Sequence, residues 1–154
     1  MARRSKHPAQ PCPVARSVEL IGERWALLIV RDAFDGICRF GDFQRSLGMA
    51  RNILADRLRL LVEAQILALR PAADGSAYQE YALTEKGEQL FPLLLALRQW
   101  GERHLFAPGE AHSRLLDRRT GKPVPAMLPR DAAGRALKPR QTLVRKVEAP
   151  ADGA

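Results

Sequence analysis

Polar and small residues recur along one side of the segment that begins near residue 50. At about 100° per residue, a helix places Asn52, Ala55, Asp56 and Arg59 on one face. Arg51 lies at the entrance of this helix. Arginine and asparagine can each form two hydrogen bonds with a base edge, and small neighbours permit close approach. The pattern therefore predicts a face that reads bases in the major groove of DNA. The alternative is an ordinary amphipathic helix with a solvated polar face.

The opposite side of this segment is apolar, with leucines at helical spacing that predict packing on a core: Leu54, Leu58 and Leu61. We expect one helix from Gly48 to Leu67, with its DNA-reading part at about residues 50–64. The segment before it, GDFQRSLG, predicts a short helix that Gly48 ends. Two short helices joined by a short turn are typical of a helix-turn-helix.

A β-hairpin is predicted directly after these two helices. Its strands are ILALR and YQEYAL, with a turn at Asp74-Gly75 between them. A hairpin in this position is the wing of a winged helix. The expected fold is therefore mainly α with a small β-hairpin wing, a winged helix-turn-helix.

Further helices flank this motif. Pro13 suits the first turn of a helix that is predicted to run through VARSVELIG and to end at Gly22. The next helix, ERWALLIVRDAF, is apolar nearly all round and so is expected to be central. ICRF is expected to be short and extended. Thr84 can cap a last helix that reaches Leu105. Pro92 should either kink that helix or mark the start of its regular part.

Other candidate DNA contacts lie around the predicted helix-turn-helix. Arg39, Arg45 and Arg70 are predicted to contact phosphates, and each could equally be an ordinary surface arginine. Ser76 and Tyr78 lie on the predicted wing, which has no Lys or Arg at its tip. Major-groove reading is therefore expected more firmly than insertion of the wing into the minor groove.

The positive charge of the chain is concentrated at its two ends. The formal net charge is +8, and residues 13–106 carry twelve basic and twelve acidic residues. Residues 1–12 carry three basic residues and no acid, whereas residues 107–154 carry ten basic and five acidic residues. Basic ends are typical of proteins that hold a polyanion, although generic solubility would give the same surplus.

The same boundaries suggest a domain organisation. We expect a basic arm at 1–11, a folded domain at 12–106 and a basic, proline-rich extension at 107–154. The extension is predicted to form either a small β-hairpin or meander or a disordered tail.

Catalysis, metal binding and membrane insertion find little support in the sequence. There is no Gly-rich phosphate loop, nucleophile elbow or metal-ligand cluster, and His7, His104 and His112 are scattered. No run of about 18 uncharged apolar residues is present, and two cysteines are too few for a disulfide scaffold. We expect a cytoplasmic protein that is not an enzyme and has no cofactor or metal.

Four stretches together resemble the HxlR family of bacterial transcription regulators, relatives of MarR: CPVARSVELIGERWALLIVRDAFDG, RFGDFQRSLGMARNILADRLRLLVEAQIL, YQEYALTEKGEQLFPLL and LRQWG. The resemblance covers about residues 12–106. It implies a winged-helix homodimer on a palindromic or near-palindromic operator, with ARNILADRLR as recognition helix and RPAADGSAYQEY as wing. In this family the first and last helices form the dimer interface. The residues so implied are Val14, Val18, Ile21, Leu94, Leu97 and Trp100.

Two departures from the family accompany the resemblance. Members often have a longer wing rich in Pro and Arg, whereas this wing is AADGSA. Some members carry a C-terminal zinc ribbon with two cysteine pairs, and the extension here has similar turn spacing without cysteine. If the extension is a relic of that ribbon, it is expected to fold without metal or to dock onto the main domain.

Alternatives for signal and function stay open. Some members sense oxidants through a cysteine in the CPV position, so Cys12, alone or with Cys38, is either a redox switch or a structural thiol. A winged-helix module that binds protein and has no operator is the other functional class. A small effector could lodge between the dimer helices near four aromatic residues that are otherwise core: Trp25, Phe34, Phe91 and Trp100.

Overall fold

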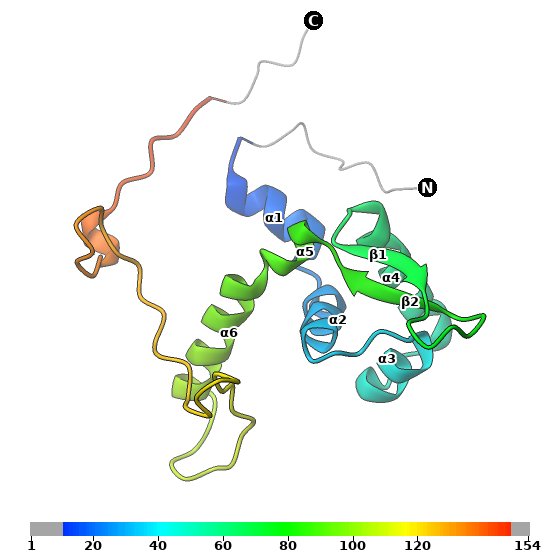
Figure 1. Ribbon diagram of the computed structural model, residues 1–154. Helices are drawn as coiled ribbons and strands as arrows, with labels where there is room; N and C mark the ends of the chain where they lie inside the picture. Colours follow the sequence, from blue (N-terminus) through cyan, green and yellow to red (C-terminus); the bar gives the residue numbers. More distant parts are fainter. Residues whose placement is uncertain (1–10, 149–154) are drawn as a thin grey trace, which may run out of the picture. The chain divides into compact units, whose positions relative to one another are not determined.

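The computed structural model describes residues 11–148, so the predicted arm at 1–11 lies almost wholly outside the described residues. The elements in chain order are α1 (Pro13–Ile21), α2 (Arg24–Phe34), α3 (Phe40–Leu47), α4 (Arg51–Glu63), β1 (Leu67–Pro71), β2 (Gln79–Leu83), α5 (Glu85–Glu88), α6 (Phe91–His104) and the 3-10 helix η1 (Pro139–Gln141) (Figure 1). The fold is mainly helical with one antiparallel hairpin. The predicted winged helix-turn-helix is confirmed.

The backbone forms two compact units. Of the described chain, residues 11–91 and 146–148 belong to the first unit and residues 92–145 to the second. The predicted domain boundary at 106 therefore lies inside the second unit. The reason is that α6 is hydrogen-bonded to the extension through the side chains of Arg98 and Gln99.

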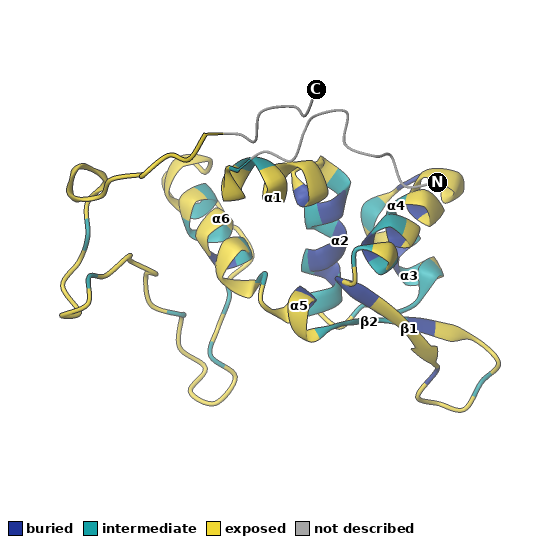
Figure 2. Ribbon diagram, turned by 90° about the horizontal axis from the view of Figure 1, so that it is seen from above, coloured by how far each residue is buried: buried dark blue, intermediate teal, exposed yellow. Residues whose placement is uncertain are grey.

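The core of the first unit surrounds α2, which packs against α1, α3, α4 and β2. Ile29 and Val30 of α2 are fully buried, and Figure 2 shows the buried colour along α2 and on one side of α4. The central position predicted for α2 is confirmed. The other large side chains that are buried almost completely are Phe43, Leu54, Leu58, Ile66 and Leu67.

Helix α4 is shorter than the sequence suggested. Gly48 adopts a left-handed conformation with φ 62° and ends α3, and α4 begins only at Arg51. At the other end, Gln65 has φ 59°, and the Ile66 N–H bonds to the Leu61 carbonyl at 2.9 Å. This reversal ends the helix at Glu63. The expected helix from 48 to 67 was therefore too long at both ends, whereas the bounds of about 50–64 expected for the recognition helix lie within one residue of those of α4.

The wing is a two-stranded antiparallel hairpin in which Leu67 pairs with Leu83 and Arg70 with Glu80. A third segment lies beside β2, because the Tyr81 N–H donates to the carbonyl of Cys38 at 2.8 Å. The extended conformation expected for ICRF is present as far as Arg39, whose backbone is also extended. The prediction is wrong for the last residue of that segment, Phe40, which is the first residue of α3.

The C-terminal helical region has a break at the place that the proline indicated. The Gly87 N–H donates to Thr84 Oγ1 at 3.0 Å, which caps α5 as predicted. Helix α6 starts at Phe91, with Pro92 as its second residue. Pro92 therefore marks the start of the regular helix, the second of the two possibilities considered.

The extension contains turns but no strand within its described residues. Isolated β-bridges join Leu116 to Pro123 and Arg130 to Ala136. The predicted turns are present at Gly121 and Gly134, both of which have positive φ. Each turn is closed by a single β-bridge, whereas a meander consists of strands with several paired residues each. The described residues of the extension therefore do not form the meander that was one of the two alternatives.

Replacing Gly87 with alanine is expected to destabilise the fold much more than replacing Gly101 with alanine. A Cβ at Gly87 would overlap the carbonyl oxygen of Ile66, whereas at Gly101 the nearest atom would be 3.9 Å away. Gly87→Ala should therefore lower the free energy of unfolding by about 1–3 kcal/mol. Gly101→Ala should be neutral or stabilising by up to about 1 kcal/mol. Urea unfolding of both variants measures the difference, and equal losses would contradict the close packing at Gly87.

Candidate nucleic-acid interface

One side of α4 is exposed to solvent, while the other is buried in the core. Leu54 and Leu58 are fully buried, so the helix cannot rotate about its axis without losing apolar contacts. Asn52 and Ala55 are exposed on the other side. The guanidinium of Arg51 lies 5.2 Å from the ring centre of Phe40, a cation–π distance. The structure thus brings the predicted base-reading residues to one exposed face.

Carboxylates on α4 hold the arginine at the far end of this face. Arg59 donates to Asp56 at 2.8 Å and to Glu63 at 2.6 Å. The hydrogen bond from Arg59 keeps the pKa of Asp56 below its ordinary value. Arg59 must therefore leave or share these carboxylates in order to reach a base.

Arg57 also pairs with acids of its own chain. Its Nε lies 3.4 Å from Glu23, and its Nη1 lies 3.6 Å from Asp56. Glu23 caps the start of α2 by accepting the Ala26 N–H. Arg57 consequently connects α4 to the central helix.

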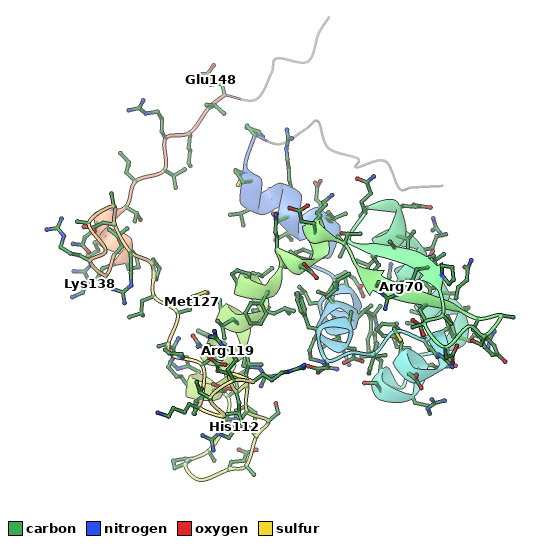
Figure 3. The ribbon with its side chains drawn as sticks, in the orientation of Figure 1. Arg70, His112, Arg119, Met127, Lys138 and Glu148 are labelled. Carbon is green, nitrogen blue, oxygen red and sulfur yellow. The ribbon has the colours of Figure 1, made fainter. Side chains whose placement is uncertain are left out.

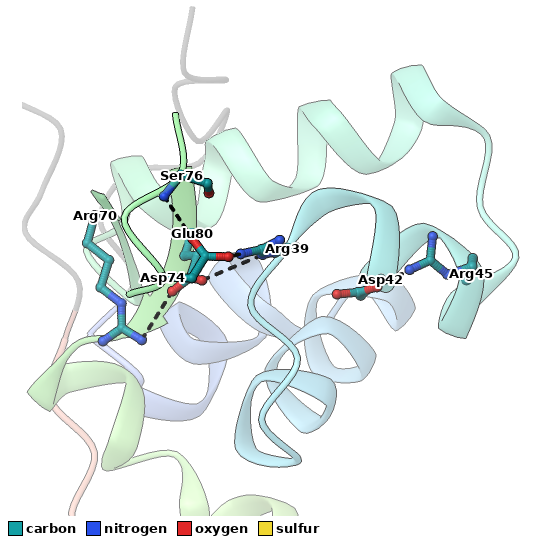
Figure 4. A network of polar contacts seen from close by, with 7 residues as sticks. All are labelled: Arg39, Asp42, Arg45, Arg70, Asp74, Ser76 and Glu80. Carbon is teal, nitrogen blue, oxygen red and sulfur yellow. Dashed lines mark hydrogen bonds and ion pairs between the residues drawn. The ribbon is translucent and has the colours of Figure 1, made fainter. Parts of the chain in front are cut away.

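A network of charged residues joins the start of α3 to the wing (Figure 4). Arg39 is paired with Asp74 in the wing turn, and its Nε lies 3.6 Å from Glu80. Arg70 lies 3.7 Å from the other oxygen of Glu80. Because Glu80 is only 5% exposed, this carboxylate needs its two arginines as counter-charges.

The wing turn is held by Asp74. Its carboxylate accepts the Ser76 N–H at 2.9 Å as well as the bond from Arg39. The bonds from Ser76 and Arg39 keep the pKa of Asp74 well below the ordinary range. The negative charge that holds this turn is therefore present throughout the neutral range.

The remaining predicted contacts are at the surface. Tyr78 is 71% exposed, and the Arg39 guanidinium lies 5.9 Å from its ring centre. Arg45 is exposed and pairs with Asp42 in the preceding turn of α3. Ser76 is half-buried. Arg39, Arg70, Ser76 and Tyr78 are thus brought together around the wing, while Arg45 lies apart on α3.

Sequence reasoning missed the two buried acids. Glu80 lies directly opposite Arg70 in the hairpin register, and this pairing could have been found once the strands were aligned. Asp32 is 2% exposed and bonds to Arg31 through one oxygen, leaving the other without a partner among the described residues. Asp32 stands in an apolar helix, and nothing in its spacing indicated burial.

The residues predicted for the dimer interface divide into exposed and buried. Val14 and Val18 on α1 are 70% and 59% exposed. On α6, Leu97 and Trp100 are 46% and 52% exposed, and Leu94 is half-buried. Ile21, in contrast, is 6% exposed and already belongs to the core of its own chain.

The aromatic residues considered for an effector have different neighbours within their own units. Phe34 packs against Phe91 with ring centres 5.7 Å apart. Trp25 instead carries the guanidinium of Arg24 over its ring at 4.5 Å. Trp100 contacts His104 within the same helix at 5.3 Å.

The two cysteines differ in their surroundings. Cys12 precedes α1 and is exposed, whereas Cys38 is half-buried beside β2, and both are free thiols. Burial raises the pKa of the Cys38 thiol, and the charge of Glu80 raises it further. Cys38 is therefore a poor thiolate at neutral pH.

This contrast predicts the order of alkylation by iodoacetamide. At pH 8, Cys12 should react about tenfold faster than Cys38, because access and thiolate content set the rate. Mass spectrometry over a time course measures both sites in the intact chain. A Cys12→Ser variant should retain only the slow phase, and equal rates at the two sites would contradict the burial of Cys38.

Comparison with known proteins agrees with this geometry. An exposed polar helix face held by a buried core, with a hairpin directly after it, defines a winged helix-turn-helix protein. The model of the HxlR-like helix-turn-helix family matches residues 20–108. The chain belongs to the HxlR family. In the part that the structure describes, none of the helices has the length and apolar character needed to cross a bilayer.

Three known proteins illustrate the range of the similarity. The helix-turn-helix type transcriptional regulator Mb3122 of Mycobacterium bovis, itself uncharacterised, is 46% identical over 62% of this chain and 60% of its own length. PA1607, a putative transcription factor with a known crystal structure, is 52% identical in sequence to this chain. The match covers 93% of this chain and all of PA1607, and the two structures superpose with a TM-score of 0.87. The redox regulator HypR in its oxidised form is 30% identical over 62% of this chain and all of its own, with a TM-score of 0.56. The chain thus spans about three fifths of the curated relative.

Proposed function

We propose that this protein is a transcription regulator that binds a palindromic DNA operator as a homodimer. The observation that carries the proposal is the exposed start of α4, where Arg51, Asn52 and Ala55 are presented by a helix whose other side is buried. A helix of this kind fits the major groove, where each base pair has a distinct pattern of donors and acceptors. The names of curated relatives support the same class.

Exposed apolar residues support the homodimer. Val14 and Val18 on α1 and Leu97 and Trp100 on α6 remain open to solvent in the single chain, and burying them would be favourable. Two copies related by a twofold axis present two recognition helices, which suits half-sites about 34 Å apart. A palindromic operator follows from that symmetry.

The direct test is binding to the DNA that flanks the coding region of this protein. Fluorescence anisotropy with excess competitor DNA should give a sequence-specific complex with two protein chains per operator. A scrambled duplex of the same composition is the control. Binding that is equally strong to both duplexes would overturn the recognition of a specific operator. No binding at any salt concentration would overturn the proposal in favour of a protein-binding module.

The basic extension predicts a specific salt dependence. Arg140, Arg145 and Lys146 are exposed, and each phosphate contact contributes about 0.9 to the slope of log K against log salt. Changing all three to alanine should reduce the slope by up to about 3 and weaken specific and non-specific binding alike. An unchanged slope would show that this segment does not contact DNA.

A thiol signal is the second candidate, because Cys12 is exposed and the similar protein HypR is a redox regulator. If Cys12 is the switch, oxidant should weaken operator binding of the protein, and dithiothreitol should restore it. The Cys12→Ser variant should bind equally with and without oxidant. A Cys12→Ser variant that still responds would exclude this thiol as the signal.

A further inference from the structure

Helix α6 and the extension form a cavity of about 310 Å³ inside the second unit. Two limbs of the extension define it, residues 112–115 and residues 123–127. Arg98 of α6 donates to the carbonyl and hydroxyl of Ser113 at 3.1 and 2.9 Å and so fixes the first limb. Gln99 donates to the Pro125 carbonyl at 2.9 Å and accepts the Met127 N–H at 2.8 Å, which fixes the second. Figure 3 labels His112 and Met127 on these limbs.

The two limbs are also joined to each other. The Val124 N–H donates to the Leu115 carbonyl at 3.2 Å, and the Asp117 N–H donates to the Lys122 carbonyl at 2.8 Å. These bonds close the turn between the limbs. Because both limbs are attached to one helix and to each other, the cavity has fixed walls, as small-molecule sites usually do.

The lining combines four apolar with five polar residues. Leu95, Leu115, Pro123 and Val124 provide apolar walls, and the polar lining is Arg98, Gln99, Glu102, His112 and Arg114.

The two arginines of the lining, Arg98 and Arg114, differ in their contacts. Arg98 is occupied by Ser113 and lies 3.8 Å from Glu102. Among the described residues, the side chain of Arg114 makes no hydrogen bond or ion pair. Its guanidinium can therefore bind an anion with two parallel hydrogen bonds without breaking an existing contact.

We propose that this cavity binds a small monocarboxylate with an apolar body, held through its carboxylate by Arg114. The volume lies at the lower end of the range for ligand sites, which indicates a small ligand. Leu115 and Val124 suit an apolar body. Two arginines and Glu102 give the lining a formal charge of +1, which favours a single negative charge over the two charges of a phosphate monoester. The proposal does not depend on DNA binding.

Isothermal titration calorimetry of the full chain tests this assignment, with hexanoate and phenylacetate as probes. Hexanamide and phenylacetamide are neutral probes of the same shape. At millimolar concentrations, at least one carboxylate should bind saturably with a stoichiometry of one per chain, and its amide should bind at least about tenfold more weakly. Absence of saturable binding by both carboxylates, or equal binding of acid and amide, would overturn the proposal.

Three variants locate the site. Arg114→Ala should weaken carboxylate binding about tenfold or more, whereas Arg118→Ala, an exposed arginine outside the lining, should leave it within about twofold. Val124→Trp should fill the cavity and abolish binding while the circular dichroism spectrum stays unchanged. Equal effects of the two arginine variants, or undiminished binding by Val124→Trp, would show that the carboxylate binds elsewhere.

Discussion

Changing Arg51 and Asn52 together to alanine is expected to weaken specific operator binding by at least about tenfold at each half-site, because each two-bond contact with a base contributes about 1–3 kcal/mol. Non-specific binding should change much less, since it depends on phosphate contacts. Anisotropy titrations with operator and scrambled duplexes at the same salt concentration measure both quantities. The ratio of the two affinities is the quantity that should fall.

Arg45→Ala is the matched comparison for this double variant. Arg45 is exposed on α3 and is predicted to contact a phosphate. Its loss should lower the affinities for operator DNA and for scrambled DNA by similar factors and leave the ratio of the two affinities unchanged. If the double variant also lost both affinities equally, α4 would not be the recognition helix.

The second large effect concerns the core that holds α4. Leu54 is fully buried, whereas its neighbour Ile53 is 42% exposed. Leu54→Ala is expected to lower the free energy of unfolding by about 2–5 kcal/mol, because it removes apolar contacts and leaves a cavity. Ile53→Ala should change it by about 0.5 kcal/mol or less. Urea unfolding followed by circular dichroism compares the two, and similar losses would mean that α4 presents a different face to the core.

The charged network would affect the proposed binding of DNA in two opposite ways. Arg39, Arg59 and Arg70 all pair with acids of their own chain. A phosphate must compete with these carboxylates, so non-specific attraction is reduced. The same pairs hold the arginine side chains in place before binding, which lowers the entropy lost when DNA is bound. The surplus charge of the extension remains available for contacts that do not depend on sequence.

Local patterns were sufficient for most of the fold. The apolar spacing of Leu54 and Leu58, the turn at Asp74-Gly75 and the cap at Thr84 each involve residues close in the chain. Such features follow from helical periodicity and turn chemistry, which single sequences contain. The extension of this helix to Leu67 was wrong because the left-handed residue Gln65, which follows the end of α4, has no strong sequence signal.

Tertiary structure decided the surroundings of the candidate sites. Arg39 pairs with Asp74 across 35 residues of chain, and the cavity beside α6 unites residues from Leu95 to Val124. The sequence by itself determined the helix face, the hairpin and the distribution of charge, because these depend on neighbours along the chain. Ion pairs, the burial of Glu80 and the walls of a cavity depend on which distant segments meet, and only packing of the whole chain determines that.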